Sequence, residues 1–359
     1  SSKFAKSKES EIYKAWAWGN YKYQSKSKKN LLYVKEQKEL EFLTFYSDCI
    51  NFSRDLINSP ANKLNPSTYY SKIKNNNLFK SFNFIDYTEK EINSNFPLTC
   101  AVGKSSSSKP KVIEITNRKL SKKDKPLVII GKGVTFDTGG VNIKPGTSMR
   151  NMKKDMGGSA IAISLFLLAN YFLKKTKIVL IAPIAENAIS SKSMRPGDVY
   201  SSVSGKSVEI AHTDAEGRLL LADAIEKASS YNPCMIIDFA TLTGAARVAL
   251  GEDLPAYFCN NETFAKKIEN LNKEKLRCWR LPLYSPYLFK IKSQVADLSN
   301  ASLDGMAGSI TAALFLQEFL KSPNIPWFHF DTFAWSQDSK GAALQGLDIM
   351  SDFLRKNFN

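Results

Sequence analysis

The chain has 359 residues, of which 43% are hydrophobic and 23% charged, a composition typical of a globular protein with one large or two medium domains. We expect no membrane-spanning helix, because the longest apolar run (161–173) is short and is interrupted by Ser164 and Asn170. The five cysteines form no CxxC pair and are odd in number, so neither a zinc knuckle nor a disulfide framework is indicated. A polar, Lys-rich start at 1–10 predicts no cleavable signal, and a reducing cytoplasm is the expected compartment.

The net charge is +16, from 50 Lys and Arg against 34 Asp and Glu. A charge of this size suits binding to nucleic acid or to an anionic surface. The positive side chains are nevertheless spread out, with local runs only at 3–29, 104–125 and 266–277. We therefore favour a solvated Lys-rich surface, and nucleic-acid binding stays open as an alternative.

The first 39 residues differ in composition from the predicted helix that follows them. Residues 1–39 are rich in Lys, Ser and aromatics and cannot build a core alone, so we interpret them as a remnant or linker preceding a main domain at 40–359. From Leu40 to Leu56, apolar residues recur at helical spacing. Ser59-Pro60 ends that predicted helix.

Strands and helices then alternate. Short apolar runs predict strands at 112–116, 127–131, 178–184, 208–211 and 235–240, and helical patterns lie between them at 158–174 and 219–230. Continuous apolar strands that alternate with helices predict an α/β fold with a mainly parallel central sheet sandwiched by helices. Functional sites of such folds gather at the carboxyl ends of the strands.

Polar, Gly-rich motifs occur where the predicted strands end. The sequence GKGVTFDTGG at 131–140 follows an apolar strand and carries Lys132 and Asp137. Asp155 lies in NMKKDMGG at 151–158, and Asp214 and Glu216 lie in HTDAEGR at 212–218, after another strand. Four carboxylates are thus expected close to strand ends or helix starts.

Carboxylates gathered in a partly desolvated site repel one another unless cations neutralise them, and hard divalent ions are the natural counter-charge. Asp214 and Glu216 stand at i and i+2, so an extended backbone would project both to the same side, one toward each of two metals. Any single acidic residue is more often a helix cap or a surface charge. For the whole set, that interpretation is much weaker.

Six segments together resemble the leucyl aminopeptidase family, also called cytosol aminopeptidases. They are 131–140, 151–158, 195–198 (RPGD), 213–219, 240–245 (ATLTGA) and 280–283 (RLPL), and TDAEGR at 213–218 is the most specific. The resemblance runs from about Asp48 to the end of the chain. Residues 16–23 look like the end of the family's N-terminal domain, most of which is expected to be absent.

The resemblance implies an aminopeptidase that releases N-terminal amino acids from peptides by a water activated by two divalent metals. Zn²⁺ or Mn²⁺ is favoured, with Mg²⁺ or Co²⁺ as alternatives. Lys144 would polarise the scissile carbonyl, and Arg218 would hold a bicarbonate that acts as general base. The implied metal ligands are Lys132 (as the neutral amine), Asp137, Asp155, Asp214 and Glu216.

The resemblance also implies a wall for the substrate, formed by Met152, Thr241, Leu242 and Gly244. Phe333 stands where many members have alanine, so it either narrows the pocket for the substrate's first side chain or packs in the core beneath it. His212 replaces the family's usual asparagine. We expect it to support the ligands rather than bind metal, because the set of five is complete without it.

A cytoplasmic homohexamer acting on peptides is the remaining expectation from the resemblance. Two rivals come from other classes: a DNA-binding or architectural protein that uses the basic surface, and an inactive structural homologue. The second is disfavoured because every implied ligand position and both catalytic positions carry the family's residues.

Overall fold

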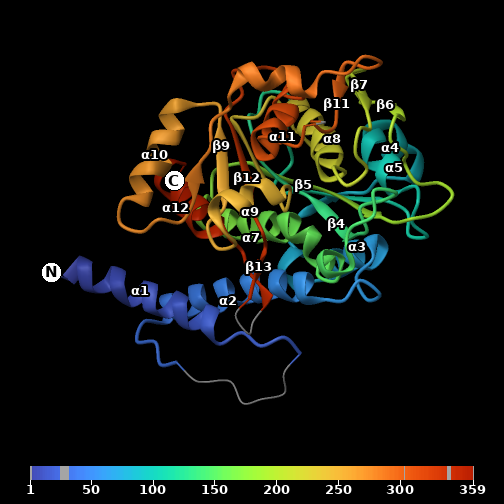
Figure 1. Ribbon diagram of the computed structural model, residues 1–359. Coiled ribbons are helices and arrows are strands. Elements are labelled where there is room, and N and C mark those ends of the chain that lie inside the picture. The colour runs from blue at the N-terminus through green and yellow to red at the C-terminus, as the bar shows by residue number, and fades with distance from the viewer. Residues whose placement is uncertain (1, 25–31, 303, 338–340, 359) are drawn as a thin grey trace.

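The computed structural model describes residues 2–24, 32–302, 304–337 and 341–358. Within these residues, the centre of the fold is one large twisted sheet (Figure 1). Its strands lie in the order β1 (Asn83–Ile85), β2 (Lys111–Thr116), β5 (Ile178–Asn187), β3 (Leu127–Gly131), β8 (Met235–Ala240), β12 (Trp327–Asp331), β9 (Ala256–Cys259) and β10 (Trp279–Arg280), with β4 (Gly133–Asp137) paired to the far end of β5.

The middle of the sheet is parallel, as predicted. β5, β3, β8 and β12 run in one direction, whereas β1, β2 and β9 pair antiparallel to their inner neighbours. The register places Gly131 beside Phe239, and Ala240 beside Asp331. The carboxyl ends of three adjacent strands therefore meet at one edge of the sheet.

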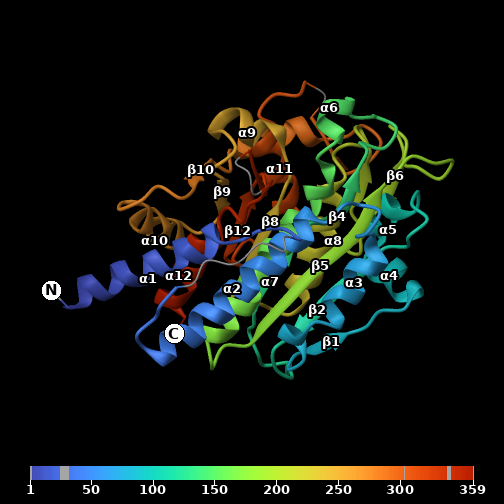
Figure 2. The same ribbon diagram turned by 90° about the horizontal axis from the view of Figure 1, so that it is seen from below.

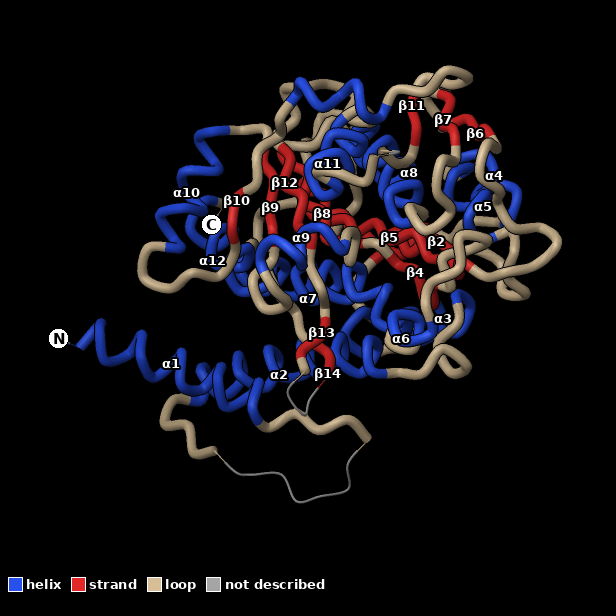
Figure 3. The backbone as a smooth tube through the Cα atoms, viewed as in Figure 1, coloured by secondary structure: helices blue, strands red, loops and turns tan. Residues whose placement is uncertain are grey.

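Helices cover both faces of the sheet, which is the predicted sandwich. α2, α7 and α12 pack on one face, and α5, α8 and α11 on the other; Figure 2 shows α2 lying over α7, and Figure 3 shows the strands enclosed by helices. The helices are α1 (Ser2–Gly19), α2 (Gln37–Asn58), α3 (Pro66–Lys74), α4 (Glu89–Asn95), α5 (Pro97–Gly103), α6 (Gly146–Met149), α7 (Gly157–Phe172), α8 (Gly217–Ser230), α9 (Gly244–Leu250), α10 (Glu262–Asn272), α11 (Gly308–Gln317) and α12 (Leu347–Asn357), with 3₁₀ turns η1 (Asn77–Phe79), η2 (Met152–Met156) and η3 (Ser285–Ile291).

The helical run Met152–Phe172 joins η2 to α7, and its α7 part is almost entirely apolar. By length and composition it could cross a membrane, contrary to the expectation from the sequence, but 83% of its most apolar window is buried inside the fold. A helix that is apolar on all sides suits a core position. It packs against the sheet on one side and α2 on the other.

One local prediction was wrong. Residues 208–211 do not add to the central sheet, because β7 (Ser207–Glu209) lies in a separate small sheet between β11 (Leu298–Ser299) and β6 (Val199–Ser201). The Gly-rich segment 131–140 contains a further strand, since β4 occupies half of it. A third small pairing joins β13 (Trp335–Ser336) to β14 (Gly341–Ala342).

The described part of the N-terminal segment packs on the main domain through α2. Trp18 donates its indole N–H to the Tyr46 hydroxyl at 2.8 Å, and the Tyr21 hydroxyl donates to Asp55 at 2.7 Å. The Arg54 guanidinium stacks on both aromatic rings, 5.2 Å from Trp18 and 4.0 Å from Tyr21. These contacts explain the cluster of aromatics near 16–23; the division at 39 stays a prediction, and residues 25–31 lie outside the described part.

Candidate functional site

The polar site lies at the edge where the parallel strands end. Lys132 follows β3 directly, and its backbone N–H donates to the Phe239 carbonyl of β8 at 3.0 Å. Asp137 is the last residue of β4, and Thr241 follows β8. Because parallel strands end at the same edge of the sheet, residues more than a hundred positions apart in the sequence lie together here.

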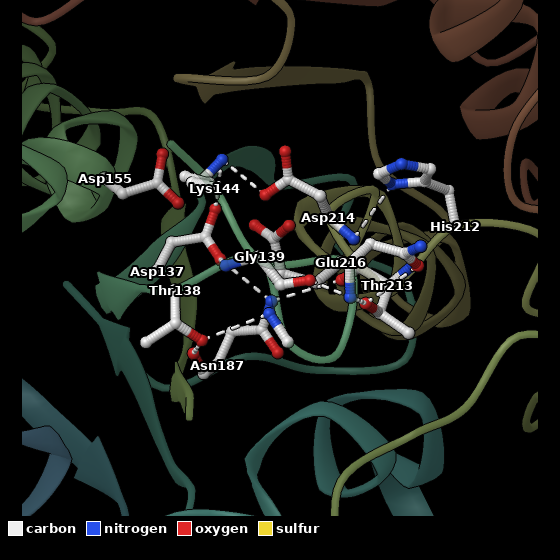
Figure 4. A network of polar contacts seen from close by, with 12 residues as sticks. Asp137, Thr138, Gly139, Lys144, Asp155, Asn187, His212, Thr213, Asp214 and Glu216 are labelled. Atoms are coloured by element: carbon white, nitrogen blue, oxygen red, sulfur yellow. Dashed lines mark hydrogen bonds and ion pairs between the residues drawn. The ribbon is translucent and has the colours of Figure 1, made fainter. Parts of the chain in front are cut away.

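Asp137 is held by a tight turn that glycine makes possible. Gly139 and Gly140 both have positive φ (86° and 63°), which other residues rarely adopt. One Asp137 oxygen accepts the Gly139 backbone N–H and the Asn187 side-chain amide, each at 2.8 Å. The turn also returns the chain so that the Lys144 backbone N–H donates to the Thr138 carbonyl at 2.9 Å, which aims Lys144 back at Asp137 (Figure 4).

Asp155 reaches the same space from the other side of the turn. It lies in η2, immediately before the buried helix α7. The Thr241 hydroxyl donates to one Asp155 carboxylate oxygen at 2.8 Å, and thereby ties η2 to the end of β8.

Asp214 and Glu216 converge, but not through the extended backbone expected for i and i+2. A turn closes from the Ala215 N–H to the His212 carbonyl at 3.1 Å, and Glu216 itself has helical φ and ψ at the start of α8. The turn is anchored by Thr213, whose hydroxyl donates to the Gly139 carbonyl at 2.6 Å. Ligand oxygens of Asp137, Asp214 and Glu216 consequently lie within 4.8 Å of one another.

Two lysines form ion pairs with these carboxylates. The Lys132 ammonium lies 2.8 Å from Asp155 and 3.0 Å from Glu216, and Lys144 lies 2.8 Å from Asp137 and pairs also with Asp214. Burial lowers the pKa of each lysine, but the neighbouring carboxylates more than offset that effect, so both values lie above the usual range.

Crowding also raises the pKa of two of the carboxyl groups. Burial, followed by the charge of Asp137, raises the pKa of Asp214 to about 7 and that of Glu216 to about 8. Buried oxygens of Asp155, Asp214 and Glu216 have no hydrogen-bond partner among the described residues, apart from the lysine ion pairs. Crowded oxygen donors that lack hydrogen bonds fit divalent cations, so the chemistry and spacing of this donor set suit the expected metals.

Arg218 adds a buried cation beside the carboxylates. It is the second residue of α8, at the end of the helix where free backbone N–H groups favour anions. Its Nε and Nη1 atoms are buried without a hydrogen-bond partner among the described residues, and burial lowers its pKa to about 10. Gly217 is required here for space, because a Cβ atom would lie 2.4 Å from the Lys132 side chain.

All residues predicted for the site line two adjoining cavities. A cavity of about 260 Å³ is lined by Lys132, Asp137, Lys144, Asp155, Asp214, Glu216, Arg218, Thr241, Leu242 and Gly244, among others. A larger pocket of about 680 Å³ shares part of that lining and adds Met152, His212 and Phe333. Phe333 is half-buried in the wall of this pocket and is not packed in the core beneath it.

His212 lies beside the ligand turn. Its Nδ1 accepts the backbone N–H of Asp214 at 3.2 Å (Figure 4). Burial and the nearby Lys144 and Arg218 lower its pKa, which keeps the ring neutral and able to accept. The contact links His212 to the turn that carries Asp214, and the supporting role expected from the sequence stays a prediction.

Three residues of the site region were missed in the sequence analysis. Asn187 donates to both Asp137 and the Thr213 carbonyl, joining two ligand loops. Asp331 accepts the backbone N–H groups of Leu242 and Thr243 at 3.2 and 3.1 Å and so positions the substrate-side loop. Asn187 and Asp331 each stand at the end of a buried strand, and this position could have identified them from the sequence. Lys154 lines the larger pocket, but no such feature of the sequence distinguishes it.

Comparisons with known proteins show the family of the chain. Residues 51–350 match the model of the cytosol aminopeptidase family, catalytic domain. A probable cytosol aminopeptidase of Syntrophotalea carbinolica is 37% identical over 82% of the chain and 59% of its own length; the chain thus spans less than two thirds of this curated relative.

Two solved structures have the same fold. The crystal structure of cytosol aminopeptidase from Coxiella burnetii superposes with a TM-score of 0.87 at 38% identity, over 98% of this chain and 79% of that one. The bottromycin maturation enzyme BotP in complex with Mn gives the same TM-score and coverage at 28% identity.

The raised carboxylate pKa values predict how stability depends on pH. Because folded Asp214 and Glu216 hold protons more tightly than in the unfolded chain, their contribution is present below about pH 4 and is lost as pH rises to about 8. The melting temperature of chelator-treated protein should therefore fall across this window less steeply for Glu216→Gln than for the wild type. The exposed Glu41→Gln is the control and should keep the wild-type slope; identical slopes in all three proteins would contradict the prediction.

Proposed function

The chain belongs to the cytosol aminopeptidase family, and we propose that it is a metal-dependent aminopeptidase that releases N-terminal amino acids from peptides. The observation that carries the proposal is the convergence of the proposed metal ligands with Lys144 and Arg218 in one cavity. Four carboxylates, two lysines and a buried arginine come from four separate segments and all line it.

The proposed metal ligands are Lys132, Asp137, Asp155, Asp214 and Glu216. These residues would hold two divalent ions, which would supply Lewis acidity to lower the pKa of water and polarise a bound carbonyl. Lys132 must lose its proton to act as a ligand. The pKa of Lys132 is raised chiefly by Asp155 and Glu216, so cations that neutralise these two carboxylates would remove the cause. A manganese complex of the related BotP supports Mn²⁺ as one of the ions to test, beside Zn²⁺, Mg²⁺ and Co²⁺.

Lys144 and Arg218 have different proposed roles. The carboxylates around Lys144 keep it an ammonium at neutral pH, able to donate a hydrogen bond to the carbonyl of the bond that is cleaved. Arg218, with two buried nitrogen atoms free of partners at a helix start, is suited to hold a bicarbonate-like anion as proton acceptor. We further propose a cytoplasmic location, peptide substrates and, by the family resemblance, a homohexamer.

The direct test is hydrolysis of a panel of aminoacyl amides by stripped protein to which Zn²⁺, Mn²⁺, Mg²⁺ or Co²⁺ is added back. We expect activity only with metal, and none on the same amides with an acetylated amino group. Asp137→Asn and Glu216→Gln should lose bound metal, measured by elemental analysis, whereas the exposed Glu41→Gln should retain it. Absence of hydrolysis with every ion and every amide would refute the proposal.

Lys144→Ala and Arg218→Ala should slow turnover while metal content stays nearly unchanged. Removing one preorganised electrostatic group costs about 10²–10³-fold in kcat. The exposed Lys192→Ala is the control for loss of a positive charge and should turn over like the wild type. Loss of metal from either site variant would assign that residue to metal binding or to the fold instead.

Phe333→Ala should enlarge the pocket for the substrate's first side chain. Since the ring lines the pocket wall, bulky first residues should overpack against it. The variant should then favour Phe or Trp over Ala by about ten- to a hundred-fold more than the wild type does, in kcat/KM. An unchanged ranking accompanied by a loss of about 3–5 kcal/mol in unfolding free energy would mean that the ring only stabilises the fold.

A further inference from the structure

Two cations bracket the ring of Phe333 in the wall of the larger pocket. The Lys154 ammonium lies 4.4 Å from the ring centroid, and the Arg247 guanidinium carbon lies 4.8 Å from it. Lys154 comes from η2 and Arg247 from the last turn of α9, so two separate elements bring positive charge to one place. Both side chains line the pocket of about 680 Å³ that adjoins the carboxylate cluster.

The Lys154 charge is buried and lacks an anionic partner. The residue is only 4% exposed, and its ammonium makes no ion pair or hydrogen bond with any residue that the structure describes. The face of Phe333 compensates for only part of the hydration that burial removes. Its neighbour Asp155 is already engaged by Lys132 at 2.8 Å and by the Thr241 hydroxyl at 2.8 Å.

The adjacent Lys153, unlike Lys154, has a hydrogen-bond partner for its ammonium group. Its ammonium donates to the Asn58 carbonyl at 3.0 Å and lies 5.3 Å from the Trp335 ring. It does not line the pocket. Lys153 thus has a hydrogen-bond partner within the fold. The ammonium of Lys154 is instead available to a ligand bound in the pocket.

We propose that this pocket receives the side chain of the substrate's first residue, and that Lys154, assisted by Arg247, selects peptides beginning with glutamate or aspartate. The inference rests on the proposed aminopeptidase function and specifies its substrate class. A side-chain carboxylate forms charge-assisted hydrogen bonds with the ammonium, whereas an aliphatic side chain leaves a buried charge unpaired. A site discriminates strongly against a substrate that would leave its buried polar groups without partners, whereas a purely apolar pocket discriminates only weakly between similar substrates.

Glutamate and glutamine differ in charge but hardly in shape, so comparing them isolates the effect of side-chain charge on kcat/KM. With metal-loaded protein and C-terminally blocked substrates, kcat/KM should be about tenfold or more higher for a Glu-amide than for the matched Gln-amide. Lys154→Met should reduce this Glu/Gln ratio about tenfold. Arg247→Met should reduce it less, because Arg247 is exposed. Lys153→Met is the matched control that keeps the wild-type ratio.

A binding measurement gives a second readout that needs no turnover. Free L-glutamate should raise the melting temperature of metal-loaded protein more than L-glutamine does, and Lys154→Met should abolish the difference. A wild-type ratio at or below one, or a Glu preference that persists in both pocket variants, would overturn the inference. So would a requirement for a free C-terminal carboxylate on dipeptide substrates, since the cations would then bind that group. Failure to hydrolyse any amide with any metal would instead refute the proposed function, and the melting shifts would still decide the pocket's preference.

Discussion

Mutual repulsion among buried carboxylates is the constraint around which this site is built. Asp137, Asp214 and Glu216 place oxygens within 4.8 Å of one another in a region largely removed from water. Such a group stays folded only if cations compensate it or if protons bind. Both occur here, since Lys132 and Lys144 form ion pairs with the cluster while the pKa values of two carboxyls rise. In the proposed function, the negative charge of this cluster attracts the divalent ions.

The rest of the architecture keeps these charges in place. The parallel centre of the sheet ends three strands at one edge, and the turns after them are fixed by side chains such as Asn187 and Thr213 that join one loop to the next. The buried helix α7 follows Asp155 at once and prevents that loop from relaxing away from the cluster. A rigid scaffold of this kind holds groups together that would otherwise separate.

Positive charge has two distinct places in the molecule. Most of the +16 excess is distributed along the chain, but Lys132, Lys144, Lys154 and Arg218 are enclosed around the two cavities. The first two are matched by carboxylates. Arg218 and Lys154 have no anionic partner among the described residues, and these unmatched cations are what suggest an anion in one cavity and an acidic side chain in the other.

The sequence by itself determined the α/β class, the main strands and helices, and the residues that converge, because apolar periodicity and the TDAEGR and GKGVTFDTGG motifs are local signals. It did not determine how they converge. Asp214 and Glu216 meet through a turn that depends on Thr213 contacting Gly139. Phe333 lines the pocket from the loop that follows β12, a strand that runs beside β8. Lys154 was indistinguishable from Lys153 in the sequence. Only the tertiary structure gave one a carbonyl partner at Asn58 and left the other in the pocket wall, since burial and partner geometry are set by contacts between distant segments.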